Sequence, residues 1–340
     1  MIRPFLTRGV RRQIKVWGGQ KLPLIAGHKL LYRCNLECEM CPFWRRPDEE
    51  LLSTSDEVRL IHHLASAGIM YLGFEGGEPL LRRDLPEILR EAHGLFHTSL
   101  VTNGWLLEHR VPEFGRYLDY LFVSIDGIGA LHDRLRGIPG SYERALKGIA
   151  RAKEYVPIAL SFTLTRDNLG DAEKVITLAE QIGVAVNVQI AYNYSTAGSL
   201  SPLGPSLRLT LERLLEMKHE GAPILNTDGY FTSIIRSWFD HGEPWECRPW
   251  MTMNVDPTGR IVLPCYVLKE YGGDHKATEV DIPGLWASID WEKFAHCNQC
   301  GLSCYLEPSL FNWTDPYQLK ARFVDQVIKW MNHSRPIAIT

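Results

Sequence analysis

The chain has 340 residues, 45% hydrophobic and 23% charged, a composition typical of an ordinary globular protein. Its net charge of −3 at pH 7 argues against nucleic acid as a partner. No apolar run approaches the roughly 20 residues of a membrane span, and the first residues lack the apolar core of a secretory signal. We therefore expect a cytoplasmic protein with one large domain and a smaller unit.

The first 28 residues form a basic segment. Six Lys or Arg residues occur before residue 25, the first acidic residue is Glu37, and apolar residues are interleaved with the cations. This pattern is typical of an amphipathic helix that can lie on an anionic membrane surface. A helix that packs on the domain by one face explains the pattern too. The shortness of the apolar face favours packing over peripheral membrane contact.

Short apolar segments alternate with helical patterns between residues 29 and 190. The expected strands cover residues 29–33, 70–75, 99–101, 120–124, 158–164 and 185–190. The expected helices cover residues 54–67, 84–93, 142–154 and 172–181. Such βα units predict an α/β fold with a parallel sheet. Because no dinucleotide-binding glycine motif follows the first strand, we favour a partial (β/α)6 TIM-type barrel, with functional side chains at the carboxyl ends of its strands.

The alternation of strands and helices stops after a Ser-, Gly- and Pro-rich loop at residues 191–206. We therefore divide the chain into a basic segment (residues 1–28), a core domain (residues 29–206) and a smaller carboxy-terminal extension (residues 207–340). A last helix is predicted over residues 317–331, where apolar residues recur at helical spacing.

The eight cysteines fall into two groups, which suggests two metal sites rather than a disulfide framework. The first group, Cys34-x3-Cys38-x2-Cys41, directly follows the first predicted strand. Three thiolates at this spacing can bind three irons of a cubane cluster and leave the fourth iron without a protein ligand. Zinc is the weaker alternative, because structural zinc sites use four ligands and no suitable fourth ligand lies nearby in the sequence.

This motif, with the apolar Met40 before its last cysteine, resembles the signature of the radical S-adenosylmethionine (SAM) superfamily. The resemblance covers about residues 29–190 and implies a [4Fe–4S] cluster on Cys34, Cys38 and Cys41 whose open iron binds SAM. It also implies an electron donor of the flavodoxin or ferredoxin type and cleavage of SAM to a 5′-deoxyadenosyl radical that attacks a C–H or C=C bond. The cofactor does the difficult chemistry, and the protein positions and shields it.

Polar or glycine motifs follow successive predicted strands, where the resemblance places the SAM contacts. The residues it assigns to SAM are Met40, Gly76, Gly77, Glu78, Pro79, Asn103, Ser124, Asp126, Thr163 and Asn187. Glycines let the backbone approach a ligand closely, and the carboxylate of Glu78 is expected to assist binding of the SAM amino group. Taken alone, the Gly-Gly-Glu-Pro motif is also explained as a plain strand-to-helix turn. Polar residues at four consecutive strand ends favour the SAM interpretation.

The second cysteine group resembles the SPASM and twitch extensions of radical SAM enzymes, which hold auxiliary clusters. A closed [4Fe–4S] cluster needs four thiolates. We expect its ligands to be Cys265, Cys297, Cys300 and Cys304, with Cys247 as the alternative to Cys265 or as a buried thiol. A structural zinc site is also open, because this ligand set suits zinc equally well.

The carboxy-terminal region resembles the tail of the hopanoid-biosynthesis radical SAM enzyme that adds an adenosyl group to a hopene. The resemblance lies in residues 245–250, 264–266 and 290–294 and in the last cysteine run. It implies a small-molecule substrate, a lipid or isoprenoid precursor. One alternative is a peptide- or protein-modifying maturase, although we see no room before residue 29 for its usual peptide-binding module. Another is a non-catalytic iron–sulfur sensor or electron carrier, against which the open iron argues.

Overall fold

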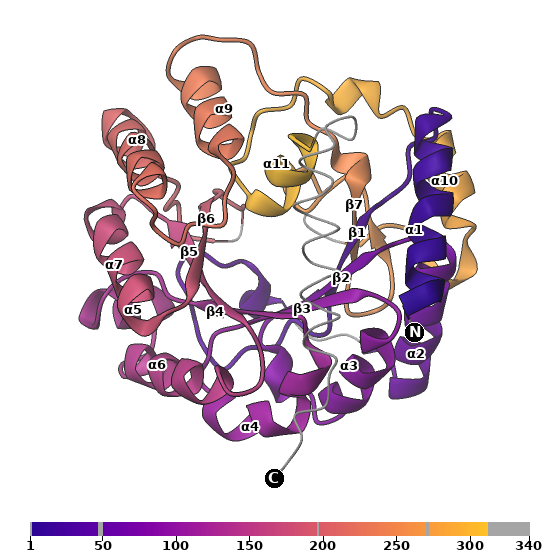
Figure 1. Cartoon of the computed structure of the whole chain (residues 1–340), viewed down its shortest axis with the longest axis horizontal. Helices are drawn as coiled ribbons and strands as arrows, with labels where there is room; N and C mark the ends of the chain where they lie inside the picture. The colour runs from indigo at the N-terminus through magenta and orange to yellow at the C-terminus, as the bar shows by residue number, and fades with distance from the viewer. Residues whose placement is uncertain (1, 47–49, 196, 270–271, 312–340) are drawn as a thin grey trace.

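The computed structural model describes residues 2–46, 50–195, 197–269 and 272–311. Its central feature is a curved eight-stranded sheet in the order β6-β5-β4-β3-β2-β1-β7-β8 (Figure 1). The strands are β1 (Ile25–Lys29), β2 (Tyr71–Glu75), β3 (His97–Thr102), β4 (Tyr120–Ser124), β5 (Ile158–Leu164), β6 (Ala185–Ile190), β7 (Thr252–Val255) and β8 (Ile261–Val262). All neighbouring strands are parallel except β7 and β8, so the carboxyl ends of seven strands share one edge.

Most of the helices lie around the outer face of this sheet, and the last described one lies between β6 and β7 (Figure 1). The helices are α1 (Ile2–Trp17), α2 (Thr54–Ser66), α3 (Leu85–His93), α4 (Leu107–Phe114), α5 (Ala130–Arg136), α6 (Ser141–Ala152), α7 (Ala172–Ile182), α8 (Pro205–His219), α9 (Asp228–Trp238), α10 (Ile282–Ser288) and α11 (Ser303–Ser309). Helix α2 begins as expected, because the Ser53 side chain accepts a hydrogen bond from the Asp56 amide. None of the helices in the described part of the chain is long and apolar enough to cross a bilayer.

The first strand differs from the prediction. We expected residues 29–33, whereas β1 ends at Lys29. Leu30 and Leu31 are fully buried, but their chain segment leaves the sheet. The Leu30 amide still donates to the carbonyl of Glu75, the last residue of β2, at 2.9 Å, whereas the Leu31 carbonyl accepts a hydrogen bond at 2.7 Å from the Gly77 amide in the loop after β2. The apolar run therefore marks the buried start of the cysteine loop.

The carboxy-terminal region contributes to the same sheet. Strand β7 pairs in parallel with β1, and β8 returns antiparallel to β7. A turn at residues 256–260 joins β7 to β8, and the Asp256 carboxylate stabilises it by accepting hydrogen bonds from the Thr258 and Arg260 amides. We did not expect β7 to extend the sheet, because four residues carry too little periodicity to show a partner strand. The helix predicted at residues 317–331 lies outside the described residues.

A buried ionic network fixes the end of β1 to the segment after β2. Glu57 of α2 has no exposed side-chain surface, and its carboxylate lies 2.7 Å from His28 Nε2 and 2.6 Å from Arg82 Nη1. Arg82 also pairs with Asp84 at 2.6 Å. This network lies close behind the sheet edge that carries the cysteine loop, so it supports the positions of both neighbouring strand ends.

Replacing Glu57 with leucine should cost about 3–5 kcal/mol of unfolding free energy, because Arg82 and His28 would lose their shared buried anion. Urea unfolding followed by circular dichroism measures this change. The control is Glu91→Leu, which removes an exposed partner of His62 and should cost less than about 1 kcal/mol. Equal losses in the two variants would contradict the structural role assigned to Glu57.

Candidate active site

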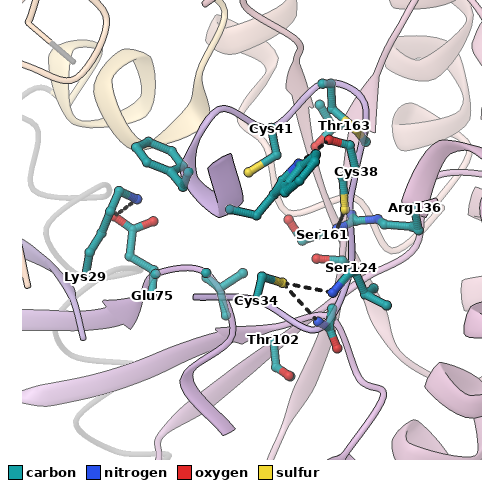
Figure 2. A pocket seen from close by; sticks show the side chains of 18 of the residues that line it. Lys29, Cys34, Cys38, Cys41, Glu75, Thr102, Ser124, Arg136, Ser161 and Thr163 are labelled. Atoms are coloured by element: carbon teal, nitrogen blue, oxygen red, sulfur yellow. Dashed lines mark hydrogen bonds and ion pairs between the residues drawn. The ribbon is translucent and has the colours of Figure 1, made fainter. Parts of the chain in front are cut away.

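A cavity lies at the carboxyl ends of β1 to β6, and the loop after β1 forms one of its walls (Figure 2). The side chains of Cys34, Cys38 and Cys41 all line it. Apart from Arg136 at the end of α5, the residues that line it come from these six strands or from the loops that directly follow them. The location agrees with the prediction that the chemistry lies at this edge of the sheet.

Hydrogen bonds within the loop hold the three cysteines. The Cys41 amide donates to the Cys38 carbonyl at 3.2 Å, and Trp44 Nε1 donates to the same carbonyl at 2.9 Å. The Leu36 amide donates to Cys34 Sγ at 3.4 Å. These bonds turn the short segment back on itself, so that all three thiols reach one cavity.

The thiols of this loop lie in a low-dielectric setting. Burial raises the pKa of Cys34 to about 12 and that of Cys38 to about 11. Asn103 Nδ2 and Arg136 Nη1 each approach one of these sulfurs at 3.7 Å, Cys34 and Cys38 respectively. Thiolates in such a site need cations beside them, and cluster irons supply that charge.

The three cysteines fit a cubane cluster better than a single metal ion. No three His, Cys, Asp or Glu side chains within the described ranges converge on one ion-sized point. A cubane cluster binds each thiolate on a different iron, so its ligands need not meet at a point. The donor set, one thiol per cluster corner in a common cavity, therefore suits a [4Fe–4S] cluster with one iron free.

The Gly-Gly-Glu-Pro motif packs against the cysteine loop. A Cβ atom at Gly77 would lie 2.2 Å from the carbonyl oxygens of both Tyr32 and Arg33. Only glycine allows this approach, and it lets the Gly77 amide reach the Leu31 carbonyl. Gly76 and Gly77 also line the cavity. The motif therefore sets the position of the loop and offers backbone to a ligand.

Glu78 lies behind the wall of the cavity. Its side chain is fully buried, and it is not among the residues that line the cavity. Its carboxylate accepts hydrogen bonds from the Leu80 amide, the Thr102 hydroxyl and the Asn103 amide at 3.0, 2.7 and 2.8 Å. The backbone at residues 80 and 103 uses this carboxylate as its acceptor, so Glu78 holds Asn103 in position. Pro79 is also buried away from the cavity.

Asp126 also lies outside the cavity lining. It is fully buried behind the cavity wall, where Arg136 Nη2 lies 2.5 Å from its carboxylate and the Thr163 amide donates to it at 2.8 Å. Arg136 does line the cavity and is the cation beside Cys38 (Figure 2). Burial lowers the pKa of Arg136, but Asp126, Cys38 and Cys41 together raise it above its usual value, so Arg136 stays charged. Asp126 therefore acts through Arg136.

The other predicted SAM contacts divide into two sets. Met40, Asn103, Ser124 and Thr163 line the cavity. Asn187 is instead outside the lining and donates to Ser303 Oγ of α11 at 3.0 Å. Sequence reasoning missed several lining residues at strand ends and in the cysteine loop. They are Lys29, Phe43, Trp44, Glu75, Arg136 and Ser161.

Lys29 forms a charged centre between the two cysteine groups. Its side chain is 4% exposed, and its Nζ lies 3.0 Å from Glu75 Oε1 and 3.9 Å from the centre of the Phe43 ring. The Tyr266 ring, next to Cys265 in the chain, lies 4.6 Å from the same nitrogen. This cation therefore contacts both the first cysteine loop and the carboxy-terminal region.

The cysteines of the second group lie together. The Cys247 thiol donates a hydrogen bond to the Cys297 sulfur, which lowers the pKa of Cys297 to about 6. Burial raises the pKa of Cys300 to about 12. Backbone amides donate to three of the sulfurs, Cys265, Cys297 and Cys300. Hydrogen bonds to sulfur are among the features that tune iron–sulfur clusters. The structure thus brings Cys247 into contact with the expected ligands.

Cys304 is the member of this group with charged neighbours near the first cysteine loop. Burial raises the pKa of its thiol, and Glu75 and Lys29 are among its charged neighbours. Tyr194 has both Cys41 and Cys304 among its electrostatic neighbours. The two cysteine groups therefore have Tyr194 as a common electrostatic neighbour.

Residues 29–179, which contain the three-cysteine loop and strands β2 to β5, match the family model described as Radical SAM superfamily. Such a domain implies a [4Fe–4S] cluster and SAM. Residues 186–323 match a second family model, described only as a domain of unknown function, DUF3463.

Two curated relatives are similar in sequence. The Fe-coproporphyrin III synthase of Methanosarcina barkeri is 31% identical over 217 residues, which are 58% of this chain and 54% of that protein. The pre-heme d1 synthase of Dinoroseobacter shibae is 32% identical over 190 residues, 53% of this chain and 44% of that protein. The chain thus spans about half the length of these relatives. Both are synthases with porphyrin-type names and neither is a hopanoid enzyme.

Solved structures share the fold. SuiB of Streptococcus suis bound to S-adenosylmethionine has a TM-score of 0.68 at 17% identity, over 83% of this chain and 70% of that one. Native anSMEcpe with bound AdoMet has a TM-score of 0.59 at 16% identity, over 91% of this chain and all of that one (100%). At these identities the likeness concerns the arrangement of the α/β fold.

Proposed function

We propose that the protein cleaves SAM reductively at a [4Fe–4S] cluster held by Cys34, Cys38 and Cys41, and uses the product to modify a small molecule. The single observation that supports this most is the convergence of the three thiols on one cavity at the carboxyl ends of β1 to β6. When bound, the reduced cluster supplies the electron that breaks the sulfonium of SAM, and the 5′-deoxyadenosyl radical attacks a C–H or C=C bond. The electron comes from a flavodoxin- or ferredoxin-type donor.

The residues around the cavity supply the SAM contacts in this proposal. Gly76 and Gly77 offer backbone to the amino group, and Arg136 offers a charged guanidinium to the carboxylate. Asn103, Ser124 and Thr163 provide polar groups at successive strand ends. Met40 and Trp44 cover the cavity from the cysteine loop and limit access of water. Glu78 and Asp126 hold Asn103 and Arg136 in place from behind the wall.

We further propose a second [4Fe–4S] cluster in the carboxy-terminal region, in the manner of SPASM and twitch extensions. Its ligands come from Cys247, Cys265, Cys297, Cys300 and Cys304, which lie together beside the cavity. In this organisation, residues 29–206 form a partial (β/α)6 barrel, residues 1–28 a basic segment and residues 207–340 the auxiliary region. Lys29 and Tyr194 lie between the two cysteine groups, where a substrate would meet both.

The substrate in this proposal is a small molecule with a large unsaturated or apolar framework. Aromatic rings gather beside the cavity, where Phe43 lies 5.9 Å from Tyr194 and 5.4 Å from Tyr266, centre to centre. Such a wall suits a flat or polycyclic skeleton. The names of the two relatives point to tetrapyrroles, and the hopanoid-type tail points to an isoprenoid lipid. Deuterium recovered in 5′-deoxyadenosine indicates C–H attack, whereas an adenosyl group in the product indicates addition to a double bond.

The experiment that tests this proposal is an iron and sulfide count after anaerobic reconstitution. The wild type should hold about eight irons, and the Cys34/Cys38/Cys41→Ala variant about four. A wild type with about four irons and a variant with almost none would confine cluster binding to the first group. Zinc in the protein as purified would then identify the second group as a structural zinc site.

A further inference from the structure

Helix α1 is amphipathic, but the usual arrangement of its two faces is reversed. The face that packs on the protein carries two arginines, and the face exposed to solvent carries three large apolar side chains. Arg12 is 3% exposed and donates to the Leu22 and Pro23 carbonyls at 2.6 and 3.2 Å. Arg8 donates to the Leu95 carbonyl. Two of the cations that made this segment look membrane-binding therefore serve to attach the helix to the rest of the protein.

The outer face carries an apolar stripe made of Val10, Ile14 and Trp17. These side chains are 60%, 59% and 65% exposed. Their spacing of four and three residues places them in one line along the helix. Single exposed apolar residues are common on protein surfaces, but a line of three on one helix face marks an interaction site. The packed inner face leaves this stripe free to contact a partner without unfolding the helix.

Positive charge lies along one side of the stripe. Arg11 and Lys15 are exposed and follow Val10 and Ile14 by one residue each, so they lie on the same flank of the helix. No Asp or Glu occurs before Glu37, although the whole chain carries a net charge of −3. An apolar stripe beside cations complements a bilayer that contains acidic lipids, because such a bilayer has anionic headgroups at its surface and an apolar interior beneath them.

The helix lies at the edge of the sheet opposite to the cavity. Its Phe5 packs with Leu24 and Met70, which precede β1 and β2, whereas the cysteine loop follows the carboxyl end of β1 (Figure 1). A bilayer against α1 would therefore leave the carboxyl ends of the strands turned away from the membrane. The stripe serves attachment rather than entry of a substrate from the lipid.

We infer that α1 docks the protein on an anionic lipid surface through Val10, Ile14 and Trp17, with Arg11 and Lys15 at the headgroup level. The test is co-sedimentation of the full reconstituted chain with phosphatidylglycerol/phosphatidylcholine vesicles and with pure phosphatidylcholine vesicles. Wild type should sediment with the acidic vesicles, and its partition coefficient should fall at least about tenfold in the Val10→Ser/Ile14→Ser/Trp17→Ser variant. Arg11→Gln and Lys15→Gln should each lower binding to acidic vesicles about fivefold.

The control is Leu203→Ser/Leu209→Ser, which removes two apolar side chains that are 76% and 65% exposed elsewhere on the surface. This variant should sediment like wild type. Equal sedimentation of wild type and the stripe variant would overturn the inference. The inference would also be overturned if the wild type formed a dimer in the absence of lipid and the stripe variant did not. That result would assign the stripe to contact with a second copy of the chain. A fall in the thermal stability of the stripe variant with unchanged lipid binding would place the stripe within the fold and would also overturn the inference. Iron content is unaffected in every outcome, so failure here is distinguishable from failure of the proposed function.

Discussion

The Cys34/Cys38/Cys41→Ala variant should form no 5′-deoxyadenosine from SAM under reducing conditions, at least about a thousandfold less than the reconstituted wild type. The reason is that these three thiols alone reach the cavity from the loop after β1, and a cluster needs three of its irons held to leave the fourth open to SAM. Liquid chromatography of quenched anaerobic reactions with dithionite measures the product.

The matched control removes thiols from the other group. Cys265, Cys297 and Cys300 receive backbone hydrogen bonds and lie together, so their replacement with alanine should remove the second cluster and leave SAM cleavage within about tenfold of wild type. Product formation in the first variant at the wild-type rate would disprove the assignment of the cleaving cluster. Loss of cleavage in both variants, with iron retained in the first loop, would show that the second group is needed for cleavage.

Arg136→Met should weaken SAM binding about ten- to a hundredfold. Charge-assisted hydrogen bonds to a charged ligand are worth about 1.5–3 kcal/mol, and Arg136 is the guanidinium that lines the cavity beside Cys38. The change should also destabilise the fold by about 3–5 kcal/mol, because the fully buried Asp126 would lose its partner. Equilibrium dialysis with labelled SAM measures binding, and urea unfolding measures stability.

Two further variants separate the binding effect from the folding effect. Asp126→Asn/Arg136→Met removes both buried charges, so it should recover much of the stability without recovering SAM affinity. Arg134→Met, on the same helix, removes an exposed partner of Asp167 and should change neither quantity appreciably. SAM affinity that returns together with stability in the double variant would show that Arg136 has only a structural role.

Much of the architecture could be predicted because the βα units carry strong periodic patterns. Strands β4, β5 and β6 begin and end at the predicted residues. The boundary of β1 was wrong because a buried apolar run looks the same whether it continues a strand or enters a loop that packs under the sheet. Helix α5 was missed because seven residues give less than two full turns of pattern.

The site was predictable in its position and less so in its individual contacts. Sequence places Glu78 and Asp126 at strand ends, but it does not show on which side of the wall a carboxylate points. Both turn inward, because buried amides and a buried arginine need an acceptor. Arg136 was missed for the converse reason, since it comes from the end of a short helix after β4 and reaches the cavity only through the tertiary fold.

The most direct test of the central claim is electron paramagnetic resonance of the reduced Cys265/Cys297/Cys300→Ala variant, recorded with and without SAM. This variant should retain only the cluster of the first loop. We predict a single [4Fe–4S] signal that changes when SAM is added, because SAM binds the iron that lacks a protein ligand, together with 5′-deoxyadenosine in the same sample. A signal that is indifferent to SAM, with no 5′-deoxyadenosine, would contradict the assignment of Cys34, Cys38 and Cys41 as the SAM-cleaving site.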